Sequence, residues 1–117
     1  RGLLRRGCNG SGGRGGAVEG MDGGKNLCCA MTRADFAGGP AGGWRPEEDL
    51  TAQEALRVFT RNVAAASGDE TRRGDLVPGF DADLTVLAED FFEVAPERVK
   101  DLSPSLTVMG GKIRFRA

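Results

Sequence analysis

Few side chains in this sequence can do chemistry, and histidine is absent altogether. The chain therefore lacks the commonest general base and the commonest ligand for transition metals. Of the three cysteines, Cys8, Cys28 and Cys29, the adjacent pair Cys28 and Cys29 is the candidate nucleophile. No base stands at a defined spacing from the pair, so both thiols are predicted to act as small buried hydrophobic residues. Histidine-based catalysis by this chain alone is excluded.

A glycine-rich run, Gly10 to Gly15, satisfies the Gly-x-Gly-x-x-Gly pattern of dinucleotide-binding sites. Such a motif needs a strand before it and a helix after it, so that backbone amides face a pyrophosphate. Neither is indicated, because Arg and Gly interrupt residues 3–9 and three more glycines fall within 17–25. The run is interpreted as a flexible tract that binds no cofactor.

Four carboxylates in the second half of the chain are the remaining candidates for a metal site, namely Asp81, Asp83, Glu89 and Asp90. Hard cations prefer oxygen ligands, but no Asp-x-Asp-x-Asp-Gly loop accompanies these residues. A solvated surface is the favoured interpretation. The sequence therefore predicts no catalytic, cofactor-binding or metal-binding residue in this chain.

Bulk charge identifies no partner, since 16 Lys and Arg face 17 Asp and Glu for a net charge of -1. Residues 13–16 resemble one unit of an RNA-binding arginine–glycine tract, but such tracts act by repetition and stacking. No stretch approaches the roughly 20 apolar residues of a membrane-spanning helix. The odd cysteine count fits neither a disulfide framework nor a zinc site, which indicates a reducing compartment. We expect a cytoplasmic chain without nucleic-acid or membrane partners.

Composition divides the chain near Trp44, because fourteen of the 19 glycines precede it. Residues 1–44 carry six basic and three acidic side chains, whereas 45–117 carry ten and fourteen. A glycine-rich segment offers little to offset an ordering entropy of about 1–2 kcal/mol per residue. We expect 1–44 to be largely loop, 1–26 to be poorly ordered in isolation, and 45–117 to carry the regular structure.

The second region predicts one amphipathic helix over 52–67. Thr51 and Glu54 have the spacing of a capping box at its start, and Gly68 is placed to end it. Apolar residues then recur at spacings of three and four, which predicts a single buried stripe. The members of this stripe are Ala55, Leu56, Phe59, Val63 and Ala66.

Three short strands are predicted after this helix. Pro78 and Gly79 favour a turn into a strand over 82–87, and Gly110-Gly111 suits a primed turn between strands at 106–109 and 112–115. A short helical turn over 95–102, with Pro96 at its first position, connects them. The result is an α+β fold whose thin core lies near the lower limit for independent stability.

The segment from Thr71 to Leu87 resembles a hallmark of the C-terminal tail of metal-dependent amidohydrolases, Gly-x-Leu-x-Pro-Gly-x-x-Ala-Asp-Leu-x-Val-Leu. The closing residues 107–113 resemble the final hairpin of these enzymes, Val-x-Gly-Gly-x-Val. Upstream, 31–35 and 39–48 are similar to the subgroup known as amidohydrolase family 3. The resemblance covers residues 30–117.

This resemblance implies a piece of a TIM-barrel hydrolase. Residues 45–67 would include the last barrel-associated helix, and 74–117 would supply strands to a small β-sandwich that the N-terminal segment of the parent completes. In the family, a Gly-Ser-Asp-Ala-Pro-Val-Glu stretch ends the last strand and its Asp serves the metal centre. Val18-Glu19 would match the end of that stretch, which puts Gly15 at the Asp position and implies that the strand over 8–12 is eroded.

The family implies metal-dependent hydrolysis of non-peptide carbon–nitrogen bonds, with zinc or another divalent metal bound by a His-x-His pair and further histidines. None of these ligands is present, and the chain begins with Arg1. The prediction is a C-terminal fragment that is inactive alone and whose partner is the missing N-terminal part. The alternative is a non-enzymatic module that pairs with another chain or itself through exposed sheet edges. A third hypothesis, an RNA-binding tail, depends on residues 13–16.

Overall fold

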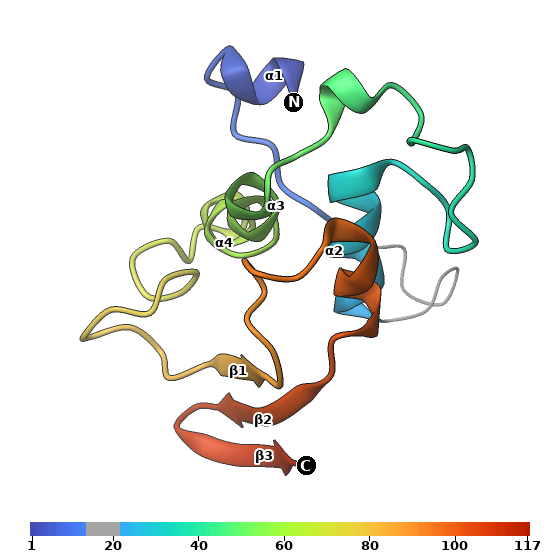
Figure 1. The fold of residues 1–117 in the computed structure, drawn as a ribbon. Coiled ribbons are helices and arrows are strands. Elements are labelled where there is room, and N and C mark those ends of the chain that lie inside the picture. The colour runs from blue at the N-terminus through green and yellow to red at the C-terminus, as the bar shows by residue number, and fades with distance from the viewer. Residues whose placement is uncertain (14–21) are drawn as a thin grey trace.

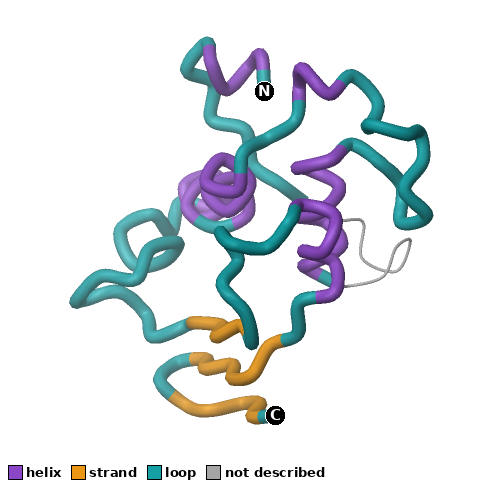
Figure 2. The backbone as a smooth tube through the Cα atoms, viewed as in Figure 1, coloured by secondary structure: helices purple, strands orange, loops and turns teal. Residues whose placement is uncertain are grey.

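A computed structural model describes residues 1–13 and 22–117 of the chain (Figure 1). Its helical part consists of α1 (Gly2–Arg5), α2 (Gly23–Thr32), α3 (Ala52–Phe59) and α4 (Arg61–Ser67), with short 3-10 helices η1 (Pro46–Glu48) and η2 (Pro96–Asp101). The strands are β1 (Leu84–Leu87), β2 (Pro104–Met109) and β3 (Lys112–Arg116). Figure 2 shows that the strands lie together at one end, apart from the helices. The predicted α+β class is confirmed.

The sheet is antiparallel throughout, in the order β1-β2-β3. Leu84 pairs with Val108 between the first two strands, and Thr107 pairs with Phe115 between the last two. Gly110 (φ 58°) and Gly111 (φ 74°) connect β2 to β3 with two left-handed residues. This backbone is the one that a two-residue primed turn requires, so the predicted hairpin is confirmed.

The first strand is shorter than predicted, because it starts at Leu84 and not at residue 82. The carbonyl of Ala82 accepts a hydrogen bond from the Gly111 amide, and the Asp83 carboxylate accepts one from the Gly110 amide at 2.7 Å. Both residues therefore bind the hairpin turn and do not extend the β1–β2 ladder.

The predicted helix over 52–67 is interrupted at Thr60, so this prediction is corrected to two helices. Thr60 leaves the helical region (φ -123°, ψ -87°), and its hydroxyl donates to the Leu56 carbonyl at 2.7 Å. The predicted ends are right: Thr51 and Glu54 form the capping box, and Gly68 ends α4 with a left-handed φ of 77°. Local backbone chemistry sets these ends, whereas apolar spacing continues across the break and does not reveal it.

The buried face of α3 and α4 also differs from the predicted stripe. Ala55 and Val58 are buried, but Leu56 and Val63 are 36% and 37% exposed. The reason is a neighbour that the spacing could not show: the Val58 carbonyl accepts from the Gly12 amide at 3.0 Å. The N-terminal segment therefore covers a different side of the helix pair.

The core lies between α2, α3, η2 and the residues just before η2. Its buried members are Cys28, Met31, Ala55, Phe91 and Val99, with partly buried Leu27, Ala30, Leu50, Ala52, Leu87, Val94 and Leu102 around them. Only one strand residue, Leu87, belongs to this group, so the sheet contributes little to the core of the described chain. That agrees with the thin core expected from the sequence.

The glycine-rich first segment contains more regular structure than the sequence predicted. Helix α2 occupies ten residues of it, with the Asp22 carboxylate accepting from the amides of Gly24 and Lys25. A Cβ at Gly24 would lie 2.9 Å from the Val99 carbonyl oxygen, so glycine lets η2 pack directly on α2. The segment expected to be largely loop thus contains a helix, and Gly24 serves its close packing on η2. Among the described residues, no helix has the length and hydropathy needed to cross a bilayer.

Candidate functional site

The tail motif builds a sharp connection from α4 to the sheet. Gly74 has a φ of 94°, and a Cβ there would lie 2.9 Å from both the Ala64 Cβ and the Arg61 Cα. Further on, the Phe80 amide donates to the Val77 carbonyl at 3.2 Å across Pro78 and Gly79, whose φ is 95°. The predicted Pro-Gly turn is therefore present. Glycine is needed at Gly74 both for its backbone and for its contact with α4.

Asp81, inside the motif, holds two consecutive arginines. Its Oδ2 accepts from Arg72 Nη2 at 2.8 Å and from Arg73 Nε at 2.9 Å, and its amide donates to the Arg72 carbonyl at 2.8 Å. The hydrogen bonds from Arg73 and then Arg72 lower the pKa of Asp81 below its ordinary value of 3.8. The carboxylate therefore closes the loop between α4 and β1, which is a structural role.

Because its pKa is lower in the folded chain than in the unfolded one, Asp81 stabilises the fold above pH 3.8 and loses that effect as the pH falls further. Asp81→Asn is thus expected to lower the unfolding midpoint at pH 7, with a smaller loss near pH 3. Urea titrations at both values measure the difference. Glu70→Gln, which removes an exposed carboxylate without an ion pair to any described residue, controls for net charge. An equal loss at both pH values would contradict the assignment.

The other three carboxylates singled out in the sequence have separate partners. Asp83 accepts from the Gly110 amide, Glu89 pairs with Arg98 at 3.2 Å, and Asp90 accepts from the Phe92 amide at 2.8 Å. Across residues 1–13 and 22–117, no three His, Cys, Asp or Glu side chains gather in a way that could hold a metal ion. The described residues therefore do not fit the zinc that the sequence resemblance implies.

The cysteines occupy three different environments. Cys28 is 5% exposed and belongs to the core, as predicted. Cys29 is half-buried, with its Sγ 3.5 Å from the Ala34 carbonyl oxygen, so the prediction of a buried residue holds there in part. Cys8 is exposed on the N-terminal segment.

The described part of the glycine run lies against the helices. The Asn62 side chain donates to the Gly10 carbonyl at 2.7 Å, and a side chain at Gly12 would collide with the Phe59 ring. The described residues of the run thus contact α3 and α4. Arg14, Gly15, Gly16 and Val18-Glu19, on which the catalytic-strand alignment and the RNA-binding hypothesis depend, lie outside the described residues.

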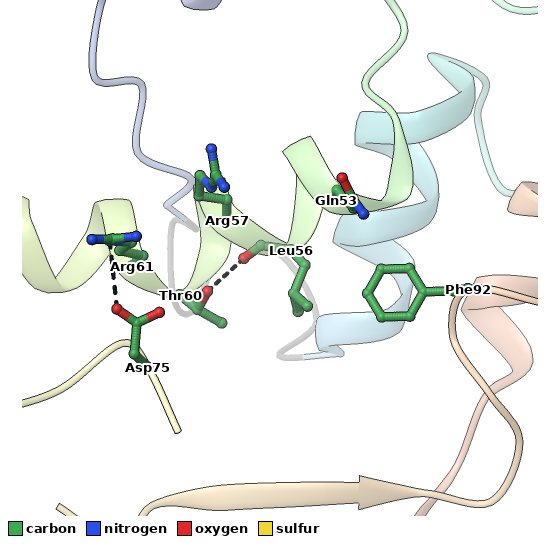
Figure 3. A pocket seen from close by; sticks show the side chains of 7 residues that line it. All are labelled: Gln53, Leu56, Arg57, Thr60, Arg61, Asp75 and Phe92. Atoms are coloured by element: carbon green, nitrogen blue, oxygen red, sulfur yellow. Dashed lines mark hydrogen bonds and ion pairs between the residues drawn. The ribbon is translucent and has the colours of Figure 1, made fainter. Parts of the chain in front are cut away.

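A surface hollow of about 290 Å³ lies beside α3 (Figure 3). Arg61 pairs with Asp75 across it at 3.5 Å, and the side chains of Leu56 and Phe92 point toward each other. Thr60 uses its hydroxyl on the Leu56 carbonyl, so it is not paired with a base. The hollow holds no nucleophile–base arrangement. Its lining residues are Gln53, Leu56, Arg57, Thr60, Arg61, Asp75 and Phe92.

The loop after α2 contains a feature that the sequence reasoning passed over. The guanidinium groups of Arg33 and Arg45 lie over the Trp44 ring, 4.9 Å and 5.8 Å from its centroid. Arg33 Nε also donates to the Trp44 carbonyl at 2.7 Å, and the Trp44 amide donates back to the Arg33 carbonyl at 2.9 Å. These contacts hold the two ends of the loop together. The sequence signal that could have predicted the cation–π contact is Arg45 directly after Trp44.

The family model described as "Amidohydrolase family" matches residues 1–115. The N-substituted formamide deformylase of Arthrobacter pascens is 36% identical over 86 residues, which are 74% of this chain and 15% of the relative. "Putative amidohydrolase YtcJ" of Bacillus subtilis (strain 168) is 29% identical over 113 residues, 97% of this chain and 21% of that protein. The chain thus spans about a fifth or less of these relatives. No solved structure gives a significant match.

Proposed function

The chain belongs to the amidohydrolase family, and from this membership we propose that it is the non-catalytic C-terminal part of a metal-dependent amide hydrolase. The observation that carries the proposal is the combination of a family match over 1–115 with a sequence that has no histidine. The family's carbon–nitrogen bond hydrolysis would then take place in the parent protein. This chain would contribute scaffold.

The proposal assigns the segments to a larger architecture. Residues 1–44 would be the remnant of the end of a TIM barrel, 45–67 would include its last helix, and 74–117 would supply strands to a small β-sandwich. The helix pair, the Gly74 connection and the closing hairpin support this assignment. The sheet's small share in the core supports a missing layer, which the N-terminal part of the parent would provide. The cysteine pattern supports a cytoplasmic location.

The metal belongs, in this proposal, to the parent and not to the chain. Zinc in hydrolases is held by His, Asp, Glu or Cys, and the described residues bring no such group together. No step of the hydrolysis is therefore assigned to a residue of this chain.

The test is hydrolysis by the purified chain with added Zn²⁺, using an N-substituted formamide, an N-acyl amino acid and a simple amide. The formamide is included because one relative is named as a deformylase of this class. We expect rates equal to buffer for all three. Metal-dependent turnover that disappears on chelation and returns on adding metal back would refute the proposal. If the proposal is right, we also expect the coding sequence upstream of this chain to contain an open reading frame with a His-x-His pair.

A second candidate, an assembly module without enzymatic function, is supported by the sheet itself. Strands β1 and β3 are its two edges, and each has one side without a strand partner among the described residues. Unpaired edges promote association with other chains or copies. Sedimentation over a wide concentration range tests self-association. A monomer at every concentration would exclude it.

A further inference from the structure

We propose that the open edge of β3 is a docking edge for an acidic extended segment of another polypeptide, which would add to the sheet as a fourth strand. β3 is the outermost strand, far from the helices in Figure 1. All five of its residues are exposed. Its free backbone groups can form a ladder with an added strand.

The charge of this strand selects the partner. Lys112, Arg114 and Arg116 form no ion pair with any residue of 1–13 or 22–117, whereas other arginines do, such as Arg72 and Arg98. Three unneutralised cations within five residues make β3 strongly basic in a chain whose net charge is -1. β3 has a bulge at Arg114, because Thr107 pairs with Phe115 and Val108 with Ile113, so its cations do not all lie on one face of the sheet. An incoming strand with carboxylates on both of its faces would neutralise them.

A second copy of the same strand does not meet this requirement. Antiparallel pairing of two β3 strands would bring the three cations of each copy together along one seam. Parallel pairing in register would place each cation opposite itself. Like charges directly opposite each other destabilise a strand pair, and cationic edges are a common protection against self-pairing.

The apolar residues of β3 favour a strand over other anionic partners. Ile113 is 54% exposed and Phe115 is 46% exposed, so apolar area lies between the cations. An extended peptide that carries both acidic and apolar side chains would cover this area and form backbone hydrogen bonds at the same time. The inference deepens the second proposal above, because it names the edge and the chemistry of the partner.

The protein itself supplies the sharpest probe. The variant K112E/R114E/R116E carries an acidic β3, and all three changes are at exposed positions. We expect the wild type and this variant to form a heterodimer at low salt. It should be about tenfold or more tighter than the homodimer of either protein, because the like charges of the two edges become opposite. High salt should weaken it. Hydrogen exchange should show protection of the amides of residues 112–116 in the mixture.

The matched control is R5E/R6E/R57E, which reverses three exposed arginines without ion pairs to described residues and away from the sheet. Its mixture with the wild type should show no such complex. A short synthetic peptide alternating Glu and Val should bind the wild type more tightly than its Lys–Val counterpart, and this measurement does not depend on folding of a variant.

Three results would overturn the inference. They are wild-type self-association as tight as the mixture, a control mixture that associates equally, or equal binding of both peptides. Association through β1 would be equally strong in the wild type, the β3 variant and the control. It would support the assembly module but not the docking edge on β3. Hydrolysis by the purified chain would refute the first proposal and leave the edge untouched.

Discussion

Phe91→Ala is expected to destabilise the fold by about 3–5 kcal/mol, the usual cost of emptying a buried aromatic site. Phe91 is 7% exposed and is the largest side chain in the core between α2, α3 and η2. The loss should appear as a lower midpoint in urea with an unchanged slope. A variant that is unfolded in buffer meets the same expectation.

The neighbouring residue is the matched control. Phe92 is 54% exposed, and its ring meets that of Phe91 edge to face with centroids 5.3 Å apart. Phe92→Ala should cost about 1 kcal/mol, because such a pair contributes about 0.5–1.5 kcal/mol. Both variants lose the ring pair, so the difference between them measures burial. Equal losses would show that Phe91 does not anchor the core.

Gly74→Ala is the second large effect, with an expected destabilisation of about 2–5 kcal/mol from left-handed backbone and overpacking together. The φ of 94° disfavours any residue with a Cβ, and the added methyl would meet Ala64 and Arg61 of α4 at 2.9 Å. Because the contact includes backbone atoms, a side-chain rotation cannot relieve it. Thermal or urea unfolding measures the loss.

Gly79→Ala separates the two causes, because Gly79 has nearly the same φ, 95°, and no atom within 4 Å of an added Cβ. It should show the backbone cost alone, about 1–3 kcal/mol. The excess at Gly74 is then the cost of pushing the tail motif away from α4. If both variants lose the same stability, the close approach at Gly74 is not needed for the fold.

Features of the chain that depend on neighbours in sequence could be predicted from the sequence. Thr51 and Glu54 satisfy each other's backbone within one helical turn, and Gly110-Gly111 supplies positive φ at both turn centres. The family could also be identified, since its hallmark is a contiguous run from residue 74 to 87. Each of these signals involves residues fewer than about fifteen positions apart.

The candidate site was harder, because its chemistry depends on which distant groups meet. The four carboxylates from Asp81 to Asp90 read as one possible cluster, and the chain gives each a separate partner. Asp81 meets Arg72 and Arg73 only after the chain has turned at Gly74 and Gly79. The spacing of the acidic residues does not indicate that Asp81 pairs with these two arginines, because the pairing depends on the turns between them.

The sequence by itself determined the α+β class, the start of α3, the end of α4, the hairpin and the lack of imidazole, because these depend on residue type and local backbone preference. Only the tertiary structure decided which side of α3 is buried, and that α2 forms despite its two first-turn glycines. In both cases the contacts involved come from far along the chain: Ala55 of α3 is buried in one cluster with Phe91 and Val99, and the Val99 carbonyl lies against Gly24 of α2. Packing between such distant segments outweighs helix propensities of about 1 kcal/mol per glycine, and no local pattern encodes it.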